Sequence, residues 1–308
     1  MKGLLLMHGS ANKMYSSTDV ITTPGTGTTN HCTRMTMTTV DRKRTVLNRL
    51  LAAFCLCGLF ALSLPATAQT AEEKGLAIAE ESDLRNEGFI DTTATMKMVL
   101  RNRAGKESIR EMRSRVLEVT GDGDKSLTIF EQPRDVKGTA SLTYSHAIKP
   151  DEQWLYLPAL KRVKRISSKN KSGPFMGSEF AFEDIASQEV EKYTYKFLQD
   201  DKLDGRDVFV VESYPAYKNS GYTRLISWID SQEYYPVKVE YYDRKDSLLK
   251  TLTLSKYEQF LGKYWRSLQM DMQNHQTGKS TTLSWADYKF QTGLTDSDFN
   301  SKSLKRLR

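Results

Sequence analysis

A two-residue alternation of apolar and polar side chains is the feature that most restricts the fold of this chain. It begins at Thr92 and continues, interrupted by short turns, to Phe290. In residues 93–101, for example, Met96 and Met98 alternate with mostly polar side chains. Successive side chains of a strand point to opposite faces of a sheet, so this period predicts strands that each have one apolar face.

Short turns separate the alternating segments. Asp204-Gly205 lies between two of them and is a strong hairpin signal. Sequential hairpins imply an antiparallel sheet, because two-residue turns join antiparallel neighbours. We expect about ten to twelve strands, among them residues 153–157, 162–166, 222–230 and 248–260.

Residues 69–308 contain no linker or internal repeat that would divide them, so we expect a single β domain. A sheet of this many strands curls instead of staying flat. The expected fold class is mainly β, with a large curved antiparallel sheet that forms an incomplete, half-open barrel. Its concave face would be apolar and would need a cover.

Residues 70–86 predict the one clear helix. Leu76, Ile78, Ala79 and Leu84 give it an apolar side, and glutamates occupy its first turn, where they suit the positive end of the helix dipole. Gly88 ends it. We expect the apolar side of this helix to pack against the concave face of the sheet.

The first 68 residues differ from the rest and predict a leader. Residues 10–39 are rich in Ser, Thr, Gly and Asn and show no hydrophobic period, and Arg42-Lys43-Arg44 precedes an apolar run over 46–64. Ala66-Thr67-Ala68 follows as a signal-peptidase site, so we expect cleavage after Ala68. The first part is expected to be disordered or untranslated, with a true start at Met35 or Met37. An uncleaved membrane anchor is the alternative, although residues 50–64 are short for a span.

Cysteine usage and charge both change at this site. All three cysteines precede Ala68, so the mature chain has none, which suits export to the periplasm. The whole chain has 45 basic and 38 acidic residues, a net charge of +7, whereas residues 1–68 hold seven basic and two acidic residues. The mature part is therefore close to +2, and its charge gives no support for nucleic-acid binding.

Aromatic side chains gather between Trp154 and Ile185. Polar and glycine residues surround them, although loops normally lie in water. One interpretation is that this loop fills a core; the other is that it forms a lid over a ligand cavity. The candidate ligand-binding residues are Trp154, Tyr156, Arg165, Phe175, Met176, Phe180 and Phe182.

A basic run accompanies these aromatic residues, with Lys161, Arg162 and Lys164 at its centre. It either keeps an exposed edge strand soluble or forms a surface for anionic headgroups or an acidic partner. By alternation, Val163 and Arg165 share one face of the strand, and Arg162 and Lys164 share the other. We expect Arg162 and Lys164 to reach water, and Arg165 is a candidate for the mouth of a cavity.

Catalytic and metal-binding patterns are missing from the mature sequence. Its two histidines, His146 and His275, are far apart and read as structural residues within strands. The segment from Asp122 has Leu127 and Pro133 where a calcium loop needs glycine and glutamate. We therefore expect no metal, no cofactor and no enzymatic activity.

Five short motifs occur in a specific order, and together they closely resemble the LolA-like outer-membrane lipoprotein-sorting protein family of Gram-negative bacteria. The resemblance extends from about Ile78 to Leu304. The motifs are Asp135-Val-Lys-Gly-Thr139, Gln153-Trp-Leu-Tyr-Leu-Pro158, Lys161-Arg-Val-Lys-Arg-Ile166, Phe175-Met-Gly-Ser178 and Phe182-Glu-Asp184.

The resemblance implies a periplasmic, incomplete antiparallel barrel whose apolar cavity is closed by an N-terminal helix and an internal lid. It also implies a carrier or chaperone that binds the acyl chains of a lipid or lipoprotein. The alternative is a non-enzymatic accessory subunit that docks on an inner-membrane RND-type exporter or an envelope assembly machine. We expect a monomer with no nucleic-acid partner.

Overall fold

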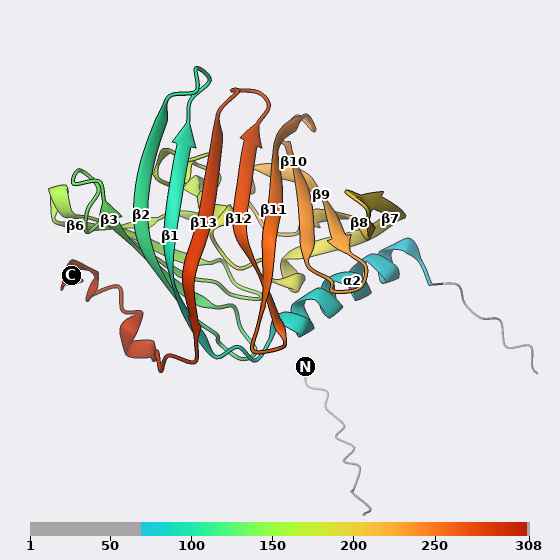
Figure 1. The fold of residues 1–308 in the computed structure, drawn as a ribbon, viewed down its shortest axis with the longest axis horizontal. Helices are drawn as coiled ribbons and strands as arrows, with labels where there is room; N and C mark the ends of the chain where they lie inside the picture. Colours follow the sequence, from blue (N-terminus) through green and yellow to red (C-terminus); the bar gives the residue numbers. More distant parts are fainter. Residues whose placement is uncertain (1–68, 307–308) are drawn as a thin grey trace, which may run out of the picture. The chain divides into compact units, whose positions relative to one another are not determined.

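A computed structural model describes residues 69–306, which form one helix, several short 3-10 turns and thirteen strands (Figure 1). The helix is α2 (Ala71–Asn86). The strands are β1 (Asp91–Arg101), β2 (Glu107–Leu117), β3 (Lys125–Gln132), β4 (Ala140–Tyr144), β5 (Glu152–Leu157), β6 (Arg162–Ile166), β7 (Tyr193–Leu203), β8 (Arg206–Pro215), β9 (Tyr222–Asp230), β10 (Pro236–Asp243), β11 (Leu248–Phe260), β12 (Tyr264–Asn274) and β13 (Ser280–Phe290).

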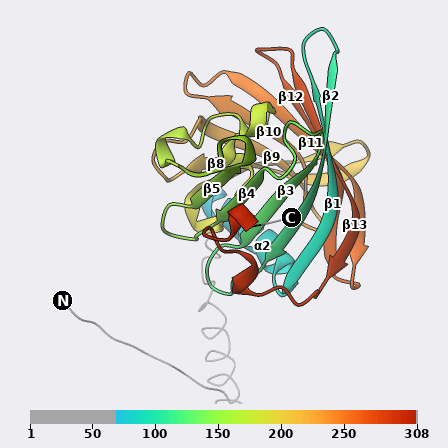
Figure 2. The same cartoon turned by 90° about the vertical axis from the view of Figure 1, so that its left-hand side faces the viewer.

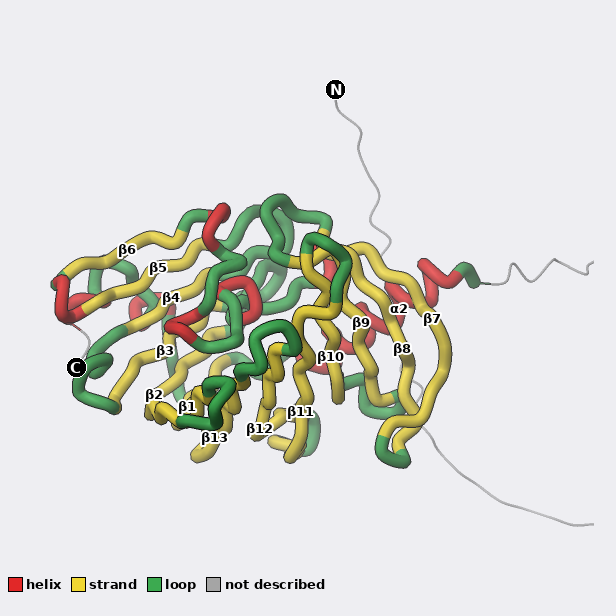
Figure 3. The backbone as a smooth tube through the Cα atoms, turned by 90° about the horizontal axis from the view of Figure 1, so that it is seen from above, coloured by secondary structure: helices red, strands yellow, loops and turns green. Residues whose placement is uncertain are grey.

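All thirteen strands belong to one antiparallel sheet, in the order β6-β5-β4-β3-β2-β1-β13-β12-β11-β10-β9-β8-β7. The last strand returns to pair with the first, for example through Met98 opposite Leu283. Strands β6 and β7 are the two free edges, so the sheet curves without closing (Figure 3). The predicted large curved antiparallel sheet is confirmed, with thirteen strands where ten to twelve were expected.

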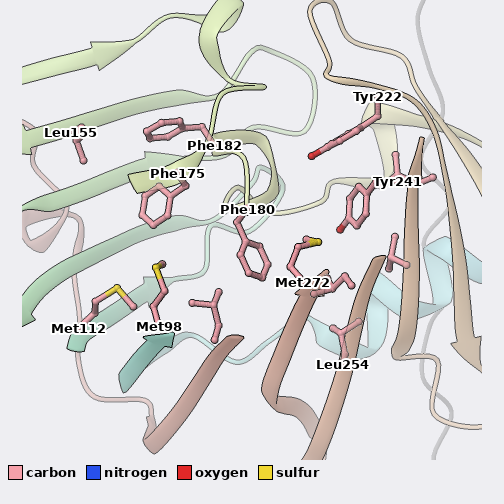
Figure 4. Close-up of a cluster of buried hydrophobic side chains, with 14 of the residues drawn as sticks. Met98, Met112, Leu155, Phe175, Phe180, Phe182, Tyr222, Tyr241, Leu254 and Met272 are labelled. Atoms are coloured by element: carbon pink, nitrogen blue, oxygen red, sulfur yellow. The ribbon is translucent and has the colours of Figure 1, made fainter. Parts of the chain in front are cut away.

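The two faces of the sheet carry separate cores. On the concave face, Met98 and Met112 join side chains from β9 to β13 in the largest buried cluster (Figure 4), to which Phe130 also belongs. On the convex face, the C-terminal segment lies over β3 and β4 (Figure 2), and its Phe299 and Leu304 pack against the aliphatic residues of that face.

The segment between the edge strands, residues 167–192, crosses the concave face inside the arc of strands (Figure 3). It carries Phe175, Phe180 and Phe182, and all three rings are buried in the concave cluster (Figure 4). The Phe175 and Phe182 rings pack edge to face, with their centroids 5.4 Å apart. The rings therefore fill a core, and their predicted gating of a cavity stays a prediction.

Buried polar contacts fix this connection to the sheet. Asp184 and Lys250 form an ion pair at 2.6 Å, and both side chains are only 4% exposed. Lys250 also donates to the carbonyl of Glu179 at 2.9 Å, and Asp184 accepts from the hydroxyl of Tyr222 at 2.8 Å. Because each charge has several partners, its burial is compensated.

Helix α2 covers the opposite end of the concave face and runs from β7 toward β12 (Figure 1). It begins with a capping box between Thr70 and Glu73. Ile78 packs against Val211 and Ile229 on the concave face, as predicted for the apolar side of the helix. The rest of that side differs from the expectation.

Leu76 and Leu84 are exposed, although the sequence placed both on the apolar side of the helix. The reason is the close approach at Gly75, which turns a different stripe inward. A Cβ atom at Gly75 would lie 2.7 Å from the backbone nitrogen of Phe197 in β7. Glycine thus lets the helix rest directly on the edge strand, which also shields that edge.

We predict that Gly75→Ala destabilises the fold, although alanine favours an isolated helix by about 1 kcal/mol. The added methyl group would force the helix away from β7. Equilibrium unfolding in urea measures the change, and Ala77→Gly on the exposed side of the same helix calibrates the propensity term. A gain in stability for Gly75→Ala would contradict the close contact.

We also predict that Lys250→Met lowers the free energy of unfolding by about 3–5 kcal/mol, because it leaves the Asp184 carboxylate buried without its cation. Lys202→Met is the matched control, since Lys202 and Asp207 also pair at 2.6 Å but are largely exposed. That control should lose less than about 1 kcal/mol. Similar losses for both variants would refute the anchoring role of Asp184.

Candidate functional site

A cavity of about 1240 Å³ lies between helix α2 and the concave face of the sheet. Its volume exceeds the range of about 300–1,000 Å³ that is typical of small-molecule sites. The connection between β6 and β7 covers the other part of the same face, so the cavity occupies the part that the connection leaves free.

The floor of the cavity is apolar. Alternate residues of neighbouring strands form it, because the antiparallel register places them in one row: Val239 lies opposite Ser227, and Leu254 opposite Met270. Val239 and Leu254 also belong to the concave core, so the floor is continuous with it. The main apolar contributors are Val211, Ile229, Val239, Leu254, Met270 and Trp285.

The roof of the cavity is the C-terminal half of α2, which polar contacts hold in place. Ser82 donates to the carbonyl of Tyr234 at 2.6 Å, and Arg85 donates to the carbonyl of Gln232 at 2.5 Å. Arg266 donates to the Asn86 side chain at 2.6 Å. The two arginine bonds are exposed and the Ser82 bond is partly buried, and each contributes about 1–3 kcal/mol.

A serine hydroxyl on the cavity wall lacks a partner. Ser213 in β8 is 3% exposed, and its Oγ is the one buried side-chain N or O atom within residues 69–306 without a hydrogen bond. It lines the cavity beside Val211 and Ser227. A buried hydroxyl without a partner costs about 1–3 kcal/mol, so this atom is notable in an otherwise satisfied structure.

Carboxylic acids from three different segments meet at the cavity mouth: Asp83 in α2, Asp124 before β3, and Glu189 before β7. Burial raises the pKa of Asp124 from 3.8 to about 6; Glu118 and Asp83 add to the shift, whereas the backbone hydrogen bond of Val119 and the charge of Arg266 oppose it. Burial, followed by the charges of Asp124 and Asp83, raises the pKa of Glu189 from 4.5 to about 7 against the opposing effect of nearby Lys192.

These raised pKa values have a consequence for stability. The folded chain binds more protons than the unfolded chain between about pH 4 and pH 7, so ionisation of Asp124 and Glu189 lowers the free energy of unfolding as the pH rises through that window. Burial also raises the pKa of Asp83, as do the charges of Glu87 and Glu191. Ionisation of these partly buried carboxyl groups thus destabilises the folded protein near neutral pH.

Other charged groups at the mouth have structural partners. Glu118 accepts the backbone N–H groups of Gly88 and Ile90, and it thereby holds the turn between α2 and β1. Ile90 has a φ of 70°, a strained value for a β-branched residue that this clamp maintains. Arg266 lies 5.3 Å from the centroid of the Phe89 ring, which suits a cation–π contact.

The residues that the sequence suggested for ligand binding do not lie together. Trp154, Tyr156 and Arg165 point to the convex face, where Trp154 and Tyr156 pack beside the C-terminal segment. Arg165 pairs with Glu152 at 3.0 Å and is largely exposed. Phe175, Met176, Phe180 and Phe182 lie in or against the concave core. None of these seven residues lines the 1240 Å³ cavity.

The basic run lies on the free edge strand β6. Val163 and Arg165 share one face and Arg162 and Lys164 the other, as the alternation predicted. Lys161, Arg162 and Lys164 are exposed, and none forms an ion pair with the residues that the structure describes. These three side chains are free to contact a partner, which leaves the predicted headgroup surface open.

His146 follows β4 and His275 follows β12, so the prediction that both lie within strands is wrong. His146 contacts Asp122 at 2.7 Å. Residues 69–306 contain no group of three or more side chains arranged to hold a metal ion. In the same range, no helix has the length and apolar character that crossing a bilayer requires. The predicted leader lies outside the described residues.

Known protein structures include several with the same fold. A family model described as an uncharacterized protein matches residues 122–306. No curated protein matches the chain. A crystal structure of a Vibrio parahaemolyticus domain named for outer-membrane lipoprotein sorting is 62% identical, covers 76% of this chain and 100% of that one, and has a TM-score of 0.75.

Two further crystal structures agree. A DUF1329 family protein from Desulfovibrio piger is 29% identical over 76% of this chain and 99% of that one, with a TM-score of 0.72. A LolA superfamily protein from Nitrosomonas europaea is 21% identical over 76% of this chain and 98% of that one; its TM-score of 0.60 supports the fold alone. From the 62% identity over the whole of the Vibrio domain, the chain belongs to the same family of outer-membrane lipoprotein-sorting domains, and its fold is LolA-like.

Proposed function

We propose that this protein is a periplasmic carrier that shelters acyl chains of a lipid or lipoprotein in the cavity under α2. The observation that carries the proposal is the apolar floor of that 1240 Å³ cavity, formed by residues such as Val211, Leu254 and Trp285. The Vibrio relative, which is named for outer-membrane lipoprotein sorting, supports the same role. Residues 1–68 would direct export and be removed after Ala68.

Burial of the acyl chain would supply the binding energy, at about 0.8 kcal/mol for each methylene group that leaves water. No bond needs to be made or broken, so the proposal requires neither a cofactor nor a catalytic group. Within this proposal, α2 is the cover that moves more readily to widen the cavity mouth. The hydrogen bonds of Ser82 and Arg85 are easier to break than the buried ion pair that holds the β6–β7 connection.

A second candidate, docking on an RND-type exporter or an envelope assembly machine, has one specific observation in its favour. Lys161, Arg162 and Lys164 are exposed on an edge strand and unpaired within the described part of the chain. An acidic partner or anionic headgroups could bind there. In that case the protein would bind its partner whether or not the cavity holds an acyl chain.

We predict that Ala79→Trp, which places an indole ring in the cavity, weakens binding of a fluorescent fatty-acyl probe about tenfold or more, or about 1.4 kcal/mol. Ala77→Trp is the matched control: it adds the same ring to the exposed side of the same helix, and it should leave binding unchanged. Titration of the delipidated proteins measures both affinities.

Two results would count against the carrier role. Equal affinity of the Ala79→Trp and Ala77→Trp variants would show that the probe binds elsewhere. Absence of probe binding to the wild-type protein would favour the docking function instead.

A further inference from the structure

The cavity mouth is strongly acidic for a site that would receive a lipid. Eight carboxylic acids and three basic side chains line the cavity and its rim. The edge strand β6 does not share this character, since its exposed run is basic. The charge at the mouth therefore indicates which end of an amphiphilic ligand would lie there.

Three of the acids form the centre of this surface, which we call the acidic triad: Asp83, Asp124 and Glu189. They come from α2, from the turn between β2 and β3, and from the segment before β7, so only the folded chain brings them together. All three line the same cavity, and Asp83 raises the pKa of both Asp124 and Glu189, as does Asp124 that of Glu189.

No cation in residues 69–306 pairs with the acidic triad within 4 Å. Lys192, the nearest candidate to Glu189, forms its ion pair with Asp151. The guanidinium group of Arg266 donates to the Asn86 side chain and lies over the ring of Phe89. Arg266 and Lys192 offset part of the negative charge at Asp124 and Glu189, but neither forms an ion pair with them in the described part of the chain. Partly buried carboxylates without a direct ion pair gain from a further cation, so the mouth suits a positively charged group of a ligand.

A second and independent observation points into the same cavity. The Ser213 hydroxyl is 97% buried and unpartnered among the described residues, and it lies on the cavity wall opposite Tyr195 and Leu225 in the sheet register. Every other buried side-chain polar atom of that part of the chain has a partner. A hydroxyl of this kind is available to donate to a carbonyl or to accept from an amine of a bound molecule.

We propose that the cavity binds an amphiphile whose head carries a primary ammonium group, with its chain on the apolar floor and its head at the acidic triad. This inference rests on the proposed carrier function and names the class of its ligand. An ammonium has three N–H donors and no acceptor, which matches a ring of carboxylates. Long-chain amines and ethanolamine phospholipids share this chemistry, whereas anionic lipids would be repelled.

Displacement of a bound fluorescent acyl probe tests the proposal on the wild-type protein. Dodecylamine, dodecanol and laurate have twelve-carbon chains and differ in head charge. We expect dodecylamine to displace the probe at a concentration at least about tenfold lower than the other two, because only its head is attracted by the carboxylates; this ratio corresponds to about 1.4 kcal/mol. Lysophosphatidylethanolamine and lysophosphatidylglycerol form a second pair that distinguishes a phospholipid source from a free amine.

Variants then locate the preference. Asp83→Asn, Asp124→Asn and Glu189→Gln together should abolish the preference for ammonium heads and leave affinity for dodecanol unchanged. The control combines Glu111→Gln, Asp201→Asn and Glu258→Gln, which are exposed and lie outside the cavity. It removes the same number of charges and should keep the preference.

Each outcome is decisive. Equal displacement by dodecylamine, dodecanol and laurate would overturn the ammonium proposal without a need for any variant, and it would leave the carrier function standing. Retention of the preference in the acidic-triad variant would also overturn it. If neither the acyl probe nor any of the amphiphiles binds, the carrier function itself fails.

Discussion

The ion pair between Asp184 and Lys250 is the interaction on which the arrangement of this protein depends. It joins the connection between the two free edges to the middle of the sheet, and both side chains are almost fully buried. Two buried charges are tolerated because Tyr222 and the carbonyl of Glu179 complete their hydrogen bonding. The connection is thereby fixed over one part of the concave face, and the three phenylalanines that it carries form a core there.

This division of the concave face decides where a ligand can bind. The half that the connection covers is packed, whereas the half beneath α2 encloses the cavity. Gly75 lets the helix rest on β7 at one end, and hydrogen bonds at the protein surface hold the other end. The β6–β7 connection is thus a rigid cover of the concave face, and α2 is a more weakly held one. The proposed carrier function uses the space beneath α2.

The strands and the fold were predictable from the sequence, since alternation with a period of two gave β6, β9 and β11 with their observed bounds. The site was not, because its floor takes single residues from several strands, and only the register brings them into one row. Alternation also cannot say which face is concave, so Trp154 and Arg165 were grouped with rings on the other face. Small polar residues at inward positions, such as Ser213 and Ser227, were the signal that could have indicated a cavity.

The most direct test of the central claim is a crystal structure of the protein with a brominated acyl chain, in which anomalous scattering locates the bromine atoms. The account predicts bromine peaks between α2 and the sheet, beside Val211, Leu254 and Trp285. Peaks on the convex face beside Trp154, or among the phenylalanine rings of the β6–β7 connection, would contradict it.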